Sequence, residues 1–208
     1  MAQARDTYRH GDLRQALLLA GMSMARDGGP DAVVLREATR QAGVSPNAAY
    51  RHFSDRQALL LAVSAAAQSL AADAMADAVA NRVLTGDAAT DARSHLRAVG
   101  TGYLRFARTE PGLFRAAFSV PDDLRRSGHP DKAGTMGLTP FQILGAALDD
   151  LEGAGLLPAE RRSNAELLAW SAVHGLGMLA IDGPLRGLDE AVLDAITMRL
   201  LDMVDRGI

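Results

Sequence analysis

Almost every segment of this 208-residue chain carries apolar residues at helical spacing, and no stretch alternates as a half-buried strand does. Glycine, proline and capping residues divide the pattern into separate helices. The predicted helices cover about 12–28, 35–42, 45–53, 55–83, 90–108, 112–118, 140–153, 163–181 and 188–206. Residues 119–139, with three glycines, two prolines and many charges, are expected to form a mobile loop. The fold is therefore predicted to be all-α.

Composition restricts the class of protein. Hydrophobic residues make up 48% and charged residues 23%, which is ordinary for a soluble protein. No apolar run approaches the ~18 residues of a membrane span, and the N-terminus lacks the apolar core of a signal peptide. The absence of cysteine excludes disulfides, thiolate zinc sites and cysteine nucleophiles. We expect a cytoplasmic protein with no membrane contact, no metal and no other cofactor.

The net charge of −3 is unevenly distributed. Residues 1–56 hold eight arginines and six acids, a net +2, so the remaining residues carry −5. A chain with a net negative charge is not expected to bind nucleic acid over its whole surface through positive charge alone. Any contact with nucleic acid should therefore lie in the first 56 residues.

The stretch from Leu35 to Phe53 has the pattern of a helix-turn-helix. Two short helices meet at a tight turn that contains Gly43, and Val44 points inward. The second helix, capped by Ser45 with Pro46 in its first turn, would be ~13 Å long and would fit a major groove ~12 Å wide. The spacing alone is equally compatible with a small helical pair that binds no DNA.

The side chains of this second helix suit DNA. Ser45, Asn47 and Ala48 are small or polar and would let the helix approach base edges. The donors that suit phosphates are Tyr50, Arg51, His52 and, after the helix, Arg56. Arg56 also stands at the amide-rich start of the next helix, which Asp55 is expected to cap.

Three segments together resemble the DNA-binding domain of the tetracycline repressor (TetR) family. They are Tyr8-Arg-His-Gly-Asp-Leu-Arg-Gln-Ala-Leu18, Leu35-Arg-Glu with Ala42-Gly-Val-Ser45, and Ala49-Tyr-Arg-His-Phe53 followed by Asp55-Arg56 and Ala58-Leu-Leu60. The likeness covers about residues 8–63. A shorter segment, Trp170-Ser-Ala-Val-His174-Gly175, resembles the Trp-His-Gly class of C-terminal domain in the same family.

The resemblance implies a three-helix DNA-binding domain over 8–56, with the helix-turn-helix at about 35–53, and a ligand-binding and dimerisation domain over 57–208. It implies a dimer on a pseudo-palindromic operator and a small-molecule effector. It implies Arg36, Asn47 and Ala48 near bases, Tyr50, His52 and Arg56 on phosphates, and Arg51 on either. Two positions depart from the family pattern: Val34 replaces a capping Ser or Thr, and Thr39 replaces an alanine at the contact between the two helices.

The C-terminal helices offer an apolar pocket. The candidate lining residues are Phe106, Phe114, Phe118, Trp170, His174 and Met178, although each could equally be part of the core. A lone histidine such as His174 is more often a hydrogen-bonded core residue than a ligand contact. Because no His, Asp or Glu stands three or four residues from it, no metal site is expected on that helix.

The last two helices are predicted to form the dimer interface. The predicted stripes are Ala165, Leu168, Ala172, Leu176 and Leu179, with small Ala169, Gly175 and Gly177 beside them, and Val192, Leu193, Ile196, Leu200 and Met203. Pairing with a second copy would bury both stripes in a four-helix bundle. The rival interpretation is that these helices only close the chain's own core.

An enzyme is a weak alternative. The sequence has no glycine-rich phosphate loop, no nucleophile elbow and no histidine-containing metal motif, and the carboxylates of Asp149 and Asp150 do not converge. A ligand-binding or adaptor protein of the same fold that has lost operator binding also stays open, because of Val34 and Thr39. We therefore expect a DNA-binding transcriptional regulator, a ligand-responsive repressor.

Overall fold

The computed structural model describes residues 10–120 and 123–208, and within these ranges it is helical with no strand. The α-helices are α1 (His10–Gly28), α2 (Leu35–Gln41), α3 (Pro46–Tyr50), α4 (Arg56–Ala80), α5 (Ala88–Thr109), α6 (Pro111–Phe118), α7 (Pro140–Gly153), α8 (Ala159–Arg162), α9 (Ala165–Ile181) and α10 (Glu190–Gly207). Three short 3₁₀ helices are η1 (Pro30–Ala32), η2 (Leu124–Arg126) and η3 (Pro130–Lys132). The predicted all-α class is confirmed.

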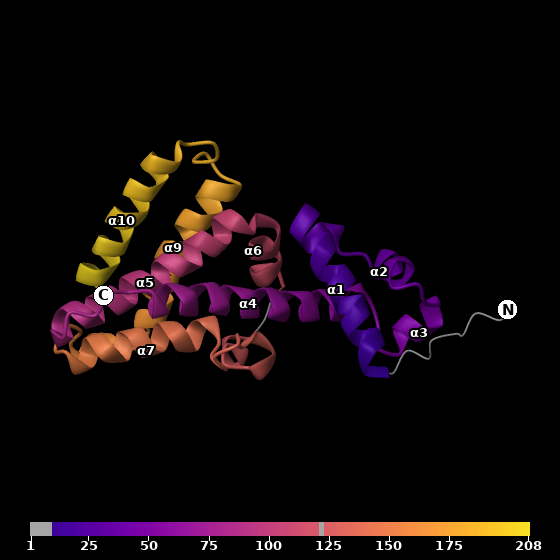
Figure 1. Ribbon diagram of the computed structural model, residues 1–208, viewed down its shortest axis with the longest axis horizontal. Coiled ribbons are helices and arrows are strands. Elements are labelled where there is room, and N and C mark those ends of the chain that lie inside the picture. Colours follow the sequence, from indigo (N-terminus) through magenta and orange to yellow (C-terminus); the bar gives the residue numbers. More distant parts are fainter. Residues whose placement is uncertain (1–9, 121–122) are drawn as a thin grey trace.

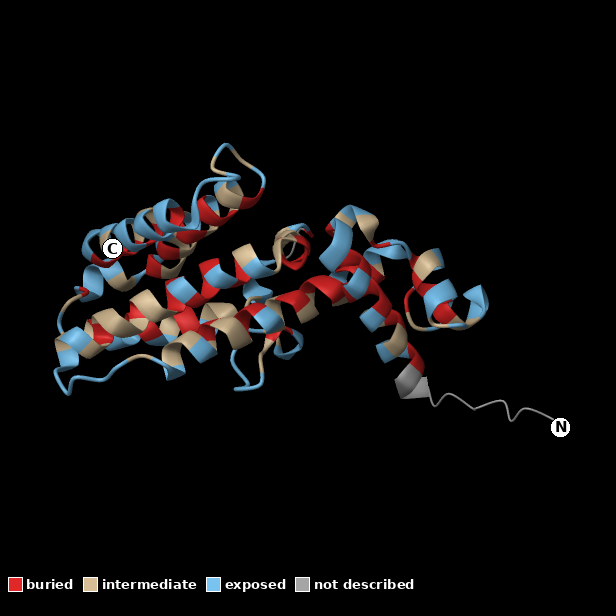
Figure 2. Cartoon of the chain, turned by 45° about the horizontal axis from the view of Figure 1, so that its top comes forward, coloured by how far each residue is buried: buried red, intermediate tan, exposed pale blue. Residues whose placement is uncertain are grey.

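The long helix α4 connects the two halves of the molecule (Figure 1). It begins after Asp55, whose carboxylate accepts a hydrogen bond from the Ala58 amide at 2.8 Å, as predicted. Its first turns bury Leu59 and Val63 on the side of α1, and its later turns bury Met75 among the C-terminal helices. Buried residues recur along α4 from Leu59 to Met75, and the buried apolar residues of both halves form one core (Figure 2).

By length and composition alone, α4 is apolar enough to cross a membrane. The sequence reading missed this because alanines, not a block of large apolar residues, supply much of its hydropathy. The helix packs against α1, α5, α6 and α7 and contributes eight buried residues to the core. This packing is that of the central helix of a folded bundle.

Two glycines allow backbones to approach closely. A Cβ on Gly102 of α5 would stand 2.5 Å from the Ala74 carbonyl oxygen of α4. A Cβ on Gly112 of α6 would collide with the carbonyl oxygens of Ala25 and Arg26 of α1. The first glycine sets the distance between the two longest helices, and the second seats the C-terminal half against α1.

Several boundaries differ from the predicted ones. Helix α1 begins two residues earlier, at His10, α3 ends at Tyr50 instead of 53, and α4 ends at Ala80 instead of 83. Helix α8 was not predicted, because four residues are too few for a periodic pattern. The segment predicted as a mobile loop contains η2 and η3, and Asp73 of α4 fixes it by accepting hydrogen bonds from the amide and hydroxyl of Thr135.

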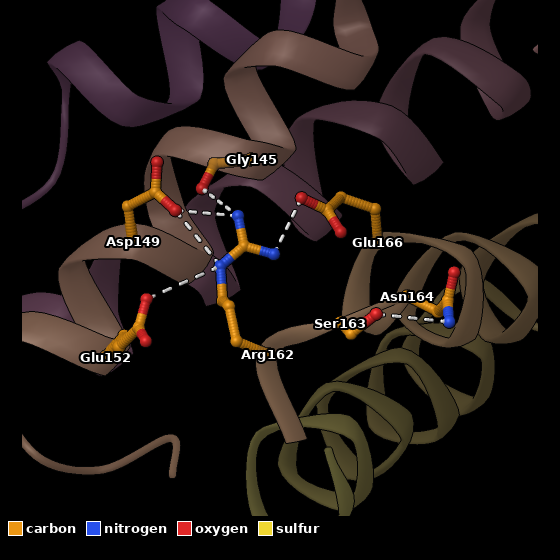
Figure 3. A network of polar contacts seen from close by, with 7 residues as sticks. All are labelled: Gly145, Asp149, Glu152, Arg162, Ser163, Asn164 and Glu166. Carbon is orange, nitrogen blue, oxygen red and sulfur yellow. Dashed lines mark hydrogen bonds and ion pairs between the residues drawn. The ribbon is translucent and has the colours of Figure 1, made fainter. Parts of the chain in front are cut away.

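Charged networks fasten the C-terminal helices to one another. Arg162 of α8 forms ion pairs with Asp149 of α7 at 2.6 Å and with Glu166 of α9 at 2.8 Å (Figure 3). Asp150, the neighbour of Asp149, instead pairs with His95 of α5 at 2.7 Å. As the sequence indicated, these two carboxylates do not converge: Asp149 contacts Arg162, and Asp150 shares a hydrogen bond with His95.

Candidate nucleic-acid interface and ligand cavity

The turn between α2 and α3 has the geometry of a helix-turn-helix. Gly43 adopts a left-handed conformation with φ +67°, which favours glycine, and the chain reverses there. Ala38 of α2 and Ala49 of α3 are fully buried, so small side chains let the two helices pack closely. Val44 is half-buried at the turn.

The two departures from the family pattern have different consequences. Thr39 is buried, but its hydroxyl donates to the Leu35 carbonyl of its own helix at 2.6 Å, so no polar group is left unsatisfied. Val34 occupies the N-cap of α2 and makes no side-chain cap. The first turn of α2 therefore lacks the hydrogen bond that a serine or threonine would give.

Helix α3 presents a polar first turn to solvent. The Ser45 hydroxyl accepts from the Ala48 amide at 3.3 Å, and Pro46 occupies the first turn, as predicted. Ser45, Pro46 and Asn47 are exposed, and Ala48 is half-buried. The Asn47 amide has no hydrogen-bond partner in the described part of the chain, so it is available for a contact outside the molecule.

Arginines around α3 fall into two groups. Arg36 and Arg51 are exposed, and neither forms an ion pair or hydrogen bond with a described residue. Arg40 instead pairs with Glu37 at 2.6 Å, and hydrogen bonds from Arg40 and Gln41 lower the pKa of Glu37 to about 2. Arg36 and Arg51, which have no such partner, are two of the three arginines that the sequence assigned to DNA.

Tyr50, His52 and Arg56 lie at the end of the motif. Tyr50 is exposed and His52 is half-buried. Arg56 donates to the carbonyl oxygens of Val33 and Pro30, at 2.8 and 2.7 Å. The guanidinium thus holds the entry to α2 against the start of α4, a positioning role that sequence reasoning did not find.

A cavity of about 320 Å³ lies among α4, α5, α7, α9 and α10. This volume is at the lower end of the ~300–1,000 Å³ range of ligand pockets. Its walls are mainly apolar and include Met75, Leu96, Phe118, Phe141, Trp170 and Leu201. Polar residues on the wall include Gln68, Arg97, Tyr103, Ser127 and Lys132.

A chain of three hydrogen-bonded side chains begins at the wall of this cavity, which Trp170 and Tyr103 line, and ends at His174 behind them. Trp170 of α9 donates from Nε1 to the Tyr103 hydroxyl oxygen at 2.9 Å, and that oxygen lies 2.9 Å from Nδ1 of His174. Because an indole nitrogen only donates, the Tyr103 hydroxyl proton is left for His174 Nδ1. Burial lowers the pKa of His174 and raises the pKa of Tyr103, so both groups are neutral near pH 7.

Two family models match the chain. The model described as bacterial regulatory proteins of the tetR family matches residues 17–63. The model described as a tetracyclin repressor-like C-terminal domain matches residues 96–204, more than half of the chain. The chain belongs to the TetR family. It is therefore a DNA-binding transcriptional regulator with a helix-turn-helix, and the Trp170–Gly175 segment lies inside its matched C-terminal domain.

Solved structures agree with the TetR fold. A protein with unknown function from Rhodococcus sp. RHA1 is 27% identical, with a TM-score of 0.66, and the match covers 98% of this chain and 99% of that one. A bacterial regulatory protein in the TetR family from Rhodococcus RHA1 is 17% identical, with a TM-score of 0.53 and coverage of 92% and 96%. No curated protein matches the chain. The domain boundary at residues 56 and 57 stays a prediction, and residues 8 and 9 lie outside the described part.

The cavity of this TetR-family chain includes only two of the six predicted lining residues, Phe118 and Trp170. Phe106, Phe114, His174 and Met178 are not among the residues that line it, and a contact between them and an effector stays a prediction. Phe114 is fully buried and stacks on His174 with ring centres 5.3 Å apart. The cavity stops at the Tyr103–Trp170 pair, and the aromatic rings beyond that pair fill the core.

Sequence reasoning missed the polar residues of the cavity wall, of which Gln68, Tyr103 and Lys132 are examples. Gln68 and Tyr103 are polar side chains on the inner faces of apolar helices, and Lys132 is the chain's one lysine. Each is the kind of exception that marks a functional position, since buried polar groups are uncommon. Helical periodicity identifies only the apolar positions of an inner face, so it does not point to these polar residues.

The predicted interface stripes on α9 and α10 include residues of an inner face, which packs on the chain's own core, and of an outer face, which is exposed. Ala165, Leu176 and Leu193 are buried in the chain's own core, as are Ala169 and Gly177. Ala172, Ile196 and Leu200 are half-buried. The exposed members of the two stripes are Leu168 (61% exposed), Gly175, Leu179, Val192 and Met203 (59% exposed), and we call this set the outer α9–α10 face.

Proposed function

We propose that this TetR-family regulator is a repressor that binds a palindromic operator as a homodimer and leaves it when a small, mostly apolar effector occupies the cavity. One observation carries the proposal: α4 joins both sites. Its first residue, Arg56, is bonded to the entry of the helix-turn-helix, and its later residues Gln68 and Met75 line the cavity. The protein would act in the cytoplasm, where the operator DNA is found.

In the operator complex, Arg36, Asn47 and Ala48 would contact base edges. Tyr50, His52 and Arg56 would contact phosphates, and Arg51 would contact either. Ser45 and Pro46 would bring the start of α3 against the groove. The exposed and unpaired side chains of Arg36, Asn47 and Arg51 support this assignment, because their donors need not leave an internal partner to reach DNA.

The homodimer would form through the outer α9–α10 face. Large apolar side chains such as Leu168 and Met203 are exposed on both helices, and a twofold partner with the same face would cover them. The two recognition helices must then lie about one helical turn of DNA apart, ~34 Å. The effector would favour a dimer in which this spacing no longer fits successive major grooves.

Operator binding tests the proposal. The full-length protein is titrated with duplexes from its own promoter region and with scrambled duplexes of the same composition. We expect strong preference for one palindromic site, with affinity that falls steeply as salt rises, because arginine–phosphate contacts release counterions. Equal affinity for scrambled DNA at ~0.15 M salt would contradict operator recognition. Ligand binding without DNA binding would favour the alternative of a small-molecule-binding or adaptor protein.

A further inference from the structure

The positive charge of Arg97 on the cavity wall is already compensated. Arg97 forms ion pairs with Asp202 at 2.7 Å and Asp205 at 3.3 Å, both on α10. Asp205 also pairs with Arg93, so two arginines of α5 face two aspartates of α10. Both contacts use Nη2 of Arg97, and its buried Nε has no hydrogen-bond partner, so the carboxylates offset the charge of Arg97 without occupying all of its donors.

The other charged wall residues are Asp123 and Lys132, which have opposite signs. Each already takes part in an interaction with another group of the protein. The charges of Asp123 and Lys132 cancel in the sum over the wall, and that of Arg97 is offset by two aspartates, so the wall carries no net charge that would attract a charged ligand. Burying such a charge without a partner is costly, so the cavity favours an uncharged molecule.

The aromatic part of the wall also offers no open hydrogen-bond donor. The Trp170 indole N–H is bonded to Tyr103, and the Tyr103 hydroxyl is bonded to His174. These side chains present ring surface to a ligand, as does Phe118, whose ring centre lies 5.5 Å from that of Trp170. Most of the wall can recognise apolar surface only.

Gln68 differs from the aromatic residues of the wall, because it has a hydrogen-bond acceptor, Oε1, without a partner among the described residues. Its Nε2 donates to the Ala117 carbonyl oxygen at 2.9 Å, and Ser64 donates to the same oxygen at 2.7 Å. Because a carbonyl oxygen only accepts, this contact fixes which end of the amide faces Ala117. The Gln68 Oε1 atom accepts no hydrogen bond from the described residues, so an acceptor on the cavity wall is left for a ligand.

We propose that the cavity binds an uncharged, largely apolar molecule that carries a hydroxyl group or similar hydrogen-bond donor, and that Gln68 reads this donor through Oε1. The inference rests on the proposed effector function of the cavity and names the chemistry of the effector. Gln68 also stands on α4, 12 residues after Arg56 and so ~18 Å along the helix. The donor would contact the helix whose first residue, Arg56, is hydrogen-bonded to the entry of the helix-turn-helix.

The experiment uses three probes of one chain length: 1-octanol, octyl methyl ether and octanoate. Trp170 is the chain's one tryptophan and lies on the wall, so its fluorescence reports occupancy. In the wild-type full-length protein at pH 7, 1-octanol should bind about fivefold tighter than the ether, the factor expected for one hydrogen bond. Octanoate should bind at least about tenfold weaker than 1-octanol.

Variants locate the residue that reads the donor. Gln68→Leu should remove the preference for the alcohol and leave ether binding unchanged, which also shows that the cavity is intact. Gln57→Leu, the same change at an exposed position of α4, should behave as wild type. Ser127→Ala tests the second hydroxyl-bearing residue of the wall and should keep the preference.

Three results would overturn the inference. They are tighter binding of octanoate than of 1-octanol, equal binding of alcohol and ether by the wild type, and a preference that survives Gln68→Leu. Absence of binding by all three probes also overturns it. Operator binding is measured separately, so a chain that binds its operator but none of these probes keeps its regulator function and loses only this assignment.

Discussion

Arg56 donates to the carbonyl oxygen of Val33 at 2.8 Å, and thereby joins the first turn of α4 to the residue two positions before α2 begins. A second bond, to the Pro30 carbonyl at 2.7 Å, strengthens the same junction. The side chain is only half-exposed. Arg56 therefore holds the segment before α2 in place, and this structural role is separate from the phosphate contact proposed for it.

The substitution Arg56→Met should lower the free energy of unfolding by about 1–3 kcal/mol, because two hydrogen bonds from a charged group are lost. Arg56→Lys keeps the charge but not the two-pronged geometry, and should recover DNA affinity more fully than stability. Urea unfolding and operator titration of the same samples check this. Wild-type stability in Arg56→Met would mean that the two carbonyl bonds contribute nothing.

Arg36→Ala and Asn47→Ala should each weaken binding to the cognate operator by about 1–3 kcal/mol and flatten the preference among base variants. Tyr50→Phe should weaken cognate and altered sites alike. All three positions are exposed, so thermal unfolding should change little. The assignment is wrong if Tyr50→Phe alters base preference while Asn47→Ala does not.

Gly102→Ala should destabilise the protein by about 1–3 kcal/mol, because the added methyl group meets the Ala74 carbonyl oxygen and must push α5 away from α4. Gly153→Ala is the matched control, since a Cβ there meets no atom within 4 Å. Chemical unfolding of both variants gives the comparison. Equal stability of the two would show that the α4–α5 spacing is adjustable.

Met203→Glu and Val192→Glu, one at each end of α10 on the outer α9–α10 face, should convert the dimer into a folded monomer. Val83→Glu places the same charge at a residue that is 80% exposed, between α4 and α5, and should stay dimeric. Sedimentation at micromolar concentration measures the outcome. If both α10 variants sediment as dimers, the interface lies elsewhere.

His174 should make stability depend on pH. Burial holds its pKa in the folded protein below the ordinary value of 6.5, so the unfolded chain binds the proton first as the pH falls. The stability that neutral His174 contributes is therefore complete above about pH 6.5 and declines below it, until the folded pKa is passed. Unfolding measured from pH 7.5 to 5 should show this slope in the wild type and a shallower one in His174→Gln. An identical slope in both would contradict it.

Local residue patterns carried most of the helix assignment. Apolar residues spaced three or four positions apart predicted nine helices, and capping residues such as Asp55 and Ser45 marked where two of them begin. This pattern did not predict α8, η2 and η3, because helices of three or four residues are too short to show a periodic spacing of apolar residues. It also placed the end of α3 three residues late, because His52 and Phe53 continue the apolar spacing inside a turn.

The sequence by itself determined the helical class, the helix-turn-helix and the exposed residues of its first turn, since all of these depend on neighbours a few positions apart. The tertiary structure decided which aromatic residues face the cavity: Phe118 and Trp170 do, whereas Phe114 and His174 pack behind them. It also decided that Arg56 bonds to Val33, and that Gln68 bonds to Ala117 across 49 positions. Such contacts depend on how the helices are rotated and how closely they approach when they pack. Helical periodicity identifies the buried face of a helix but not the residues of other helices that this face contacts.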